Sequence, residues 1–128
     1  NDAINYVKAK NIKVALASSS SYKIINAALQ KLDIADDFEI INSAESEPLG
    51  KPHPGVYLTT AEKLGVSPQN CLALEDSLNG VLAAKAAQMK CIAIPEMSEL
   101  HNPKFAIADM VLESLQQLDD NIWDFVDS

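Results

Sequence analysis

Residues that could hold a phosphate group and a metal ion lie in three separate segments of the sequence. Ser18 to Ser21 is a run of hydroxyls before a predicted helix, where free backbone amides and the helix dipole favour an anion. Lys51 lies in a loop, residues 50–54, whose two prolines hold its ammonium group at a fixed point, where it can neutralise phosphate charge. Glu75 and Asp76 are adjacent carboxylates, a pair that is natural around a hard cation such as Mg2+.

Each segment also has an ordinary structural explanation. Serines before a helix commonly act only as N-caps, most lysines are solvated, and Asp76 can cap the helix that follows it. His53 is interpreted as a local cap and not as a ligand. Cys71 and Cys91 begin short apolar runs and are interpreted as buried thiols without chemistry. No segment establishes a function when it is considered alone.

The elements that must position these residues alternate between strand and helix character. This alternation predicts an α/β fold in which a parallel, Rossmann-like sheet has helices on both faces. The strand candidates are residues 13–17, 39–41, 71–74, 91–94 and 110–112. In an open parallel sheet, ligands bind beyond the carboxyl ends of the strands, so we expect all three segments to meet at one rim.

The helical segments have recognisable boundaries. Apolar residues at helical spacing, from Ile25 to Leu32, predict a helix whose preceding turn is capped by Ser19 or Ser20. A second helix is expected from Pro54 to Gly65, and a third after Asp76 or Ser77. A short amphipathic closing helix is predicted from four residues near the end of the sequence: Leu118, Ile122, Trp123 and Val126.

The composition favours one soluble domain, residues 1–128. The 128 residues are 48% hydrophobic, enough for one core, and the longest apolar runs are far shorter than the roughly 20 residues that cross a bilayer. The net charge of -8 repels polyanions. Cysteine usage fits a reducing cytoplasm. We therefore expect a cytoplasmic protein that has no nucleic-acid or membrane partner.

Taken together, three motifs resemble motifs two, three and four of the haloacid dehalogenase superfamily, in the correct order. They are ALASSS at residues 15–20, GKPHPGVY at 50–57 and LEDSLNG at 74–80. The resemblance extends from about residue 12 to residue 115 and is greatest to the subgroup of beta-phosphoglucomutase and the hexitol phosphate and 2-deoxyglucose-6-phosphate phosphatases. It implies that the chain is the C-terminal part of such a hydrolase core.

The resemblance also implies a role for each candidate residue. Ser18 and the Ser19 amide would hold phosphate oxygens, and Lys51 would be catalytic by bridging the phosphate and a nucleophilic carboxylate. Glu75 and Asp76 would bind Mg2+ as the cofactor. These roles agree with the needs of in-line phosphoryl transfer, which are charge compensation and positioning.

Motif one of the family is absent. It is an Asp-x-Asp on the first strand, which supplies the phosphorylated aspartate and the acid-base aspartate; no Asp-x-Asp occurs in these 128 residues. The helical cap that selects the substrate is also absent. In the family fold the first strand lies between the strands that begin here near Val14 and Cys71. We therefore expect an incomplete core with a split sheet, whose edges pair with another chain or with a missing N-terminal part.

The leading hypothesis is a fragment, inactive alone, of a magnesium-dependent phosphatase that hydrolyses small phosphosugars through an aspartyl phosphate. A phosphosugar mutase of the beta-phosphoglucomutase type is one alternative, because the same core residues serve both. A catalytically silent domain that binds an anion is another. A receiver domain is disfavoured because no acceptor aspartate follows the first two predicted strands. In the parent enzyme, Asp76→Asn should abolish turnover, and Lys51→Ala should remove phosphate affinity without unfolding the protein.

Overall fold

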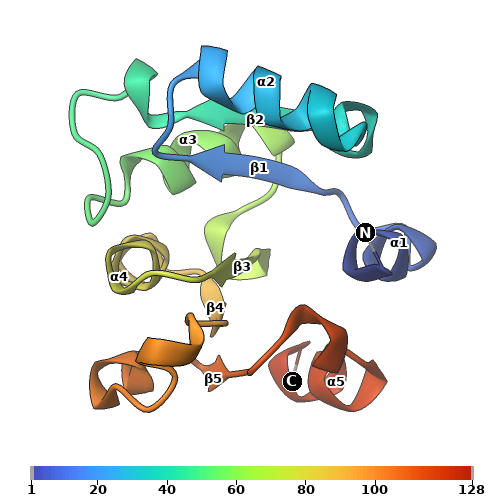
Figure 1. Ribbon diagram of the computed structural model, residues 1–128, viewed down its shortest axis with the longest axis vertical. Coiled ribbons are helices and arrows are strands. Elements are labelled where there is room, and N and C mark those ends of the chain that lie inside the picture. Colours follow the sequence, from blue (N-terminus) through green and yellow to red (C-terminus); the bar gives the residue numbers. More distant parts are fainter. Residues whose placement is uncertain (1, 128) are drawn as a thin grey trace.

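The fold contains five short parallel strands that form two separate sheets. A computed structural model describes residues 2–127 of the chain, and the side chains of residues 4–34 and 36–123. One sheet pairs β1 (Ala15–Ser18) with β2 (Ile40–Ser43), and the other has the order β3-β4-β5. The strands of the second sheet are β3 (Leu72–Glu75), β4 (Lys90–Ala93) and β5 (Met110–Val111). Figure 1 shows the two sheets one above the other, β1 nearest to β3.

Within the described part of the chain, five α-helices connect and flank the strands. They are α1 (Asp2–Ala9), α2 (Tyr22–Leu32), α3 (Gly55–Leu64), α4 (Leu78–Ala86) and α5 (Asp120–Asp127). Short 3-10 helices occur at Ala35–Asp37, Ala44–Ser46, Pro68–Asn70, Met97–Glu99, Pro103–Ile107 and Leu115–Gln117. The parallel α/β fold expected from the sequence is therefore confirmed, although α1 was not predicted.

The helix ends correct some details of the sequence interpretation. Ser21, and not Ser19 or Ser20, caps α2, because its side chain accepts a hydrogen bond from the Ile24 amide. Pro54 precedes the first residue of α3, and Gly65 ends this helix in the left-handed region at φ 72°. Of the two candidate caps of α4, Ser77 accepts from the Gly80 amide. The closing helix α5 is confirmed, but it begins after Leu118, and the side chain of Val126 lies outside the described residues.

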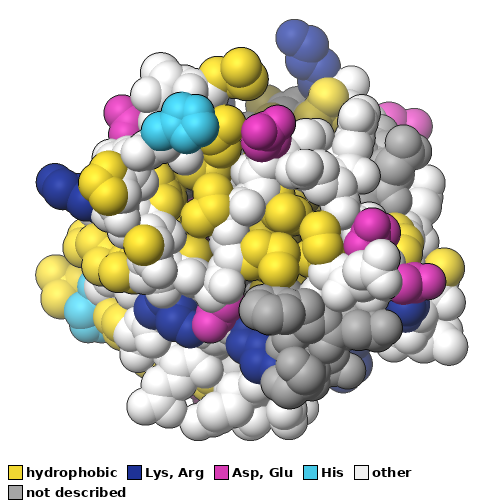
Figure 2. Space-filling model, turned by 90° about the horizontal axis from the view of Figure 1, so that it is seen from below, with side chains coloured by type: hydrophobic (Ala, Val, Ile, Leu, Met, Phe, Trp, Pro, Cys, Tyr) yellow, Lys and Arg dark blue, Asp and Glu magenta, His cyan; other side chains and the backbone are white. Residues whose placement is uncertain are grey.

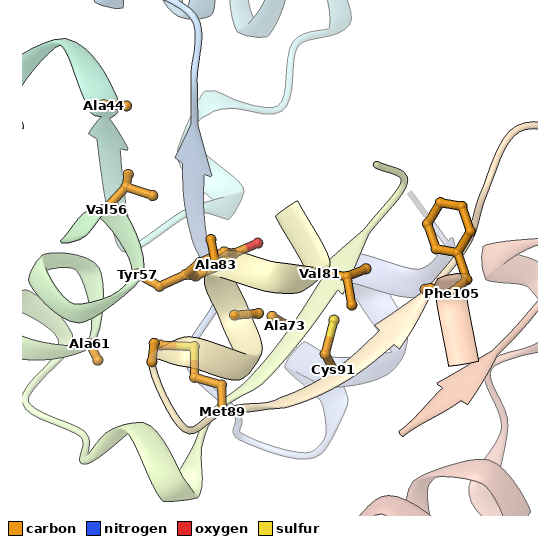
Figure 3. Packing of buried hydrophobic residues seen from close by; sticks show 13 residues of the cluster. Ala44, Val56, Tyr57, Ala61, Ala73, Val81, Ala83, Met89, Cys91 and Phe105 are labelled. Atoms are coloured by element: carbon orange, nitrogen blue, oxygen red, sulfur yellow. The ribbon is translucent and has the colours of Figure 1, made fainter. Parts of the chain in front are cut away.

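Side chains of the second sheet alternate between two hydrophobic clusters, one on each face. Ala73 and Cys91 pack with residues of α3 and α4, including Tyr57 and Val81 (Figure 3). On the other face, Ile92 packs with Leu112 and Leu118, and residues of α1 and α5 lie against this second cluster. Helices therefore cover both faces of this sheet, as the alternating pattern predicted.

The split between β1 and β3 is the largest departure from a regular sheet. β1 pairs only with β2, and β3 pairs only with β4, so each of these two strands has a neighbour on one side only. The expected split sheet is thus confirmed.

On the face seen in Figure 2, lysine and acidic side chains are interspersed, and hydrophobic groups lie between them. Among the described residues, no helix combines the length and apolar character needed to cross a membrane.

Candidate functional site

All five residues singled out from the sequence line one pocket of about 580 Å3. The pocket lies where β1 and β3 end, so residues far apart in the chain come together at the carboxyl end of the two strands. Its lining includes Ser18, Ser19, Lys51, Glu75 and Asp76. The structure therefore brings the three sequence segments to a common rim, while the role of each residue remains a proposal.

The serine loop after β1 is fixed by its own hydrogen bonds. The Ser18 hydroxyl oxygen accepts from the Ser20 amide at 3.1 Å, and the Ser43 hydroxyl donates to the Ser20 carbonyl at 2.5 Å. Since Ser18 is an acceptor in this contact, its hydroxyl proton can still be donated to a ligand. Ser19 is exposed at the pocket. This loop can present hydroxyl and amide donors to an anion.

Lys51 is held by a carboxylate as well as by the loop. Its Nζ lies 2.5 Å from Glu75 Oε2 and 3.5 Å from the Ala17 carbonyl oxygen, and its side chain is 11% exposed. The Lys51–Pro52 peptide bond is cis. His53 Nδ1 accepts from the Gly55 amide at 3.0 Å, which confirms the interpretation of His53 as a local cap.

The adjacent carboxylates Glu75 and Asp76 have different environments. Glu75 is buried, and its Oε2 accepts hydrogen bonds from both Lys51 and the Tyr57 hydroxyl. Asp76 is exposed and lines the pocket. Within the described residues, no group of three or more acidic, histidine or cysteine side chains could enclose a metal ion. This donor set suits Mg2+, which keeps several waters and uses only one or two protein carboxylates together with phosphate oxygens.

Tyr57 contacts Glu75 of the site, but it entered the sequence-based prediction only as the last residue of the motif GKPHPGVY, without a role. It lies on α3, and its hydroxyl donates to Glu75 Oε2. Burial, followed by the Glu75 carboxylate, raises the pKa of the Tyr57 phenol, so the hydroxyl remains a donor. The motif did not predict the partner of this tyrosine, because Glu75 lies 18 positions away.

A second, larger cavity of about 740 Å3 occupies the gap between the two sheets. It is lined by β1 and β3, by residues of α3, and by Leu118 and Trp123. Four residues line both this cavity and the polar pocket, so the two spaces adjoin each other: Leu16, Ala17, Leu74 and Leu115. An apolar cleft between two strand edges thus lies next to the candidate anion site.

Comparisons with known proteins agree on one family. A family model described as haloacid dehalogenase-like hydrolase matches residues 1–88. Hexitol phosphatase B of Escherichia coli K12 is 44% identical over 117 residues, which cover 91% of this chain and 53% of that protein. Beta-phosphoglucomutase of Bacillus subtilis is 35% identical over 114 residues, covering 87% of this chain and 50% of that protein.

A solved structure shows the same fold. The crystal structure of beta-phosphoglucomutase from Clostridium difficile superposes with a TM-score of 0.85 at 31% identity, covering 98% of this chain and 54% of that one. The chain spans about half the length of the relatives that it matches.

Proposed function

This chain belongs to the haloacid dehalogenase-like hydrolase family, and from this we propose that it forms the phosphate- and metal-binding half of a phosphatase acting on small phosphorylated sugars. The observation that carries the proposal is the single pocket that joins Ser18, Lys51 and Asp76 at the ends of β1 and β3. Relatives named as hexitol phosphatase and beta-phosphoglucomutase support the substrate class.

We assign a different role in phosphoryl transfer to each group of pocket residues. Ser18 and the Ser19 amide would hold the oxygens of the transferring phosphoryl group, and Lys51 would neutralise their charge. Asp76, with Glu75 beneath it, would hold Mg2+, which would supply charge compensation on the phosphate. In the proposed reaction a carboxylate attacks phosphorus, and an acid protonates the leaving sugar oxygen. Water then hydrolyses the aspartyl phosphate and releases inorganic phosphate.

In this proposal the nucleophile would come from outside these 128 residues, because they contain no Asp-x-Asp. We propose that an extended strand bearing this motif enters the cleft between β1 and β3 and pairs with both edges. If it runs parallel to them, its carboxyl end emerges at the polar pocket, where Lys51 could contact its aspartate. The chain alone should therefore bind phosphate and Mg2+ without turnover.

The direct test is a chimera that supplies the missing part. The portion of E. coli hexitol phosphatase B that this chain does not cover would be joined to this chain, and phosphate release would be measured with sugar phosphates and Mg2+. We expect turnover in the chimera and none in the isolated chain. An inactive but folded chimera, or turnover by the isolated chain, would contradict the proposal.

Two alternatives give different results in the same assay. A phosphosugar mutase, suggested by the beta-phosphoglucomutase relatives, would isomerise the sugar phosphate faster than it releases phosphate. A silent anion-binding domain would bind phosphate at Ser18 and Lys51 but give no turnover in any chimera. As the partner we propose a small phosphorylated metabolite, and as the location the cytoplasm.

A further inference from the structure

Tyr57 contacts both members of the ion pair in the pocket. Its hydroxyl donates to Glu75 Oε2, the same oxygen that accepts from Lys51. Its ring centroid lies 5.0 Å from Lys51 Nζ, within cation-π range. Tyr57 thus joins α3 to the ammonium group that precedes this helix and to the carboxylate that ends β3.

The Glu75 carboxylate has little freedom to move. An ideal Cβ atom at Gly80 would lie 1.9 Å from Glu75 Oε1, so this oxygen rests against the first turn of α4. The other oxygen is held by Tyr57 and Lys51. Because the donors share one acceptor atom, loss of the Tyr57 hydroxyl would change the position of Lys51 through Glu75.

Hydrophobic packing explains the ring of Tyr57 but not its hydroxyl. The ring belongs to the core cluster around Val81 and Ala83, where phenylalanine would fill nearly the same volume. The hydroxyl instead lies in a buried environment, where Tyr57 is 7% and Glu75 8% exposed. In such an environment, a hydrogen bond to a charged group stabilises more than one between neutral groups.

We propose that Tyr57 is a positioning residue, whose hydroxyl fixes Glu75 so that the Lys51 ammonium group is presented to the anion pocket. This inference rests on the proposed phosphate site and adds a residue to it. Tyr57 need not touch the ligand, since it acts through the carboxylate that holds Lys51.

The test is NMR of the lysine ammonium groups in the 128-residue chain. In the wild type, the Lys51 ammonium should exchange its protons slowly with water, because it is largely buried and paired. In Tyr57→Phe this exchange should accelerate about tenfold or more, as expected from the loss of a hydrogen bond to a charged group. Lys85, paired with Asp109, serves as the internal reference.

Tyr6→Phe is the matched control. Its hydroxyl also donates to a carboxylate, that of Asp120, but it lies outside the pocket, so Lys51 exchange should not change. Unchanged Lys51 exchange in folded Tyr57→Phe would overturn the proposal.

A second measurement does not depend on the folding of a variant. In wild-type chain labelled at the tyrosine Cζ atoms, inorganic phosphate should shift the Tyr57 signal together with that of Lys51, and leave the Tyr6 signal in place. A Lys51 shift without a Tyr57 shift would overturn the positioning role. If phosphate leaves the Lys51 signal unshifted, the result would instead contradict the proposed function. The proton-exchange experiment would still test the role of Tyr57.

Discussion

The carboxylate of Glu75 lies against the backbone of Gly80, so closely that a Cβ atom there would come within 1.9 Å of Oε1. Alanine normally stabilises a helix interior by about 0.5 to 1 kcal/mol relative to glycine. At this position the clash should dominate, and Gly80→Ala should lower the free energy of unfolding by about 1 to 3 kcal/mol in urea titrations. Gly50→Ala is the control, because nothing lies within 4 Å of its Cβ position. Equal stabilities of the two variants would contradict the close contact.

Removal of Lys51 should destabilise the protein, contrary to the sequence-based expectation that Lys51→Ala leaves the fold intact. The pair is largely buried, with side-chain exposures of 11% for Lys51 and 7% for Glu75. Breaking a buried pair leaves an uncompensated charge, so Lys51→Met should cost about 3 kcal/mol in urea unfolding. Lys104→Met, at an exposed lysine, should change stability by less than about 0.5 kcal/mol. A loss of similar size in both variants would argue against the ion pair.

Asp76 and Glu75 should respond differently to loss of charge. Because Asp76 is exposed, Asp76→Asn should weaken Mg2+ binding measured by calorimetry, with a stability change below about 0.5 kcal/mol. Glu75→Gln, in contrast, should lower the free energy of unfolding, since the buried Lys51 would lose its charged partner. Unaltered Mg2+ affinity in Asp76→Asn would remove this residue from the proposed metal site.

The contact of Asp109 predicts a pH-dependent contribution to stability. Partial burial alone would raise its pKa, but hydrogen bonds from Lys85 and the Cys91 amide hold the pKa below its usual value. A lowered folded-state pKa stabilises the protein above the unfolded value of about 4, and this contribution disappears as pH falls through the folded-state pKa. Asp109→Asn should therefore cost less than about 1 kcal/mol at pH 7, because the pair is partly exposed.

The difference in free energy of unfolding between the wild type and Asp109→Asn should shrink below pH 4, as measured by urea titrations of both proteins. Lys85→Met should show the same trend, since it removes the other side of the pair. A wild-type advantage that persists at pH 2 would contradict this assignment.

The cleft between the sheets should accept a strand in trans. A six-residue apolar peptide with an acidic C-terminal residue should change the emission of Trp123, the single tryptophan, which lines the cleft. Amide exchange should slow in β1 and β3, which have one strand neighbour, and change little in β4, which has two. A peptide with a central proline should not bind. Binding that leaves β1 and β3 unprotected would exclude strand pairing.

The local sequence pattern predicted the strands and helices better than it predicted which side chains contact one another. The five strands lie within a few residues of the predicted ranges, because short apolar runs define them locally. The cap of α2 was misplaced within a run of four serines, which are locally equivalent donors and acceptors. The resemblance supplied the place of the missing first strand and hence the expected split between β1 and β3. No local pattern could reveal that Tyr57 and Lys51 share one oxygen of Glu75, because that contact depends on how α3 crosses the ends of the strands.

The cleft also affects how the chain would behave at high concentration. Its open edges can pair with strands of other molecules as readily as with a specific partner, so self-association should rise steeply with protein concentration. The net charge of -8 opposes this through mutual repulsion, and added salt would weaken that protection. Dilute, low-salt buffers should therefore keep the isolated chain monomeric.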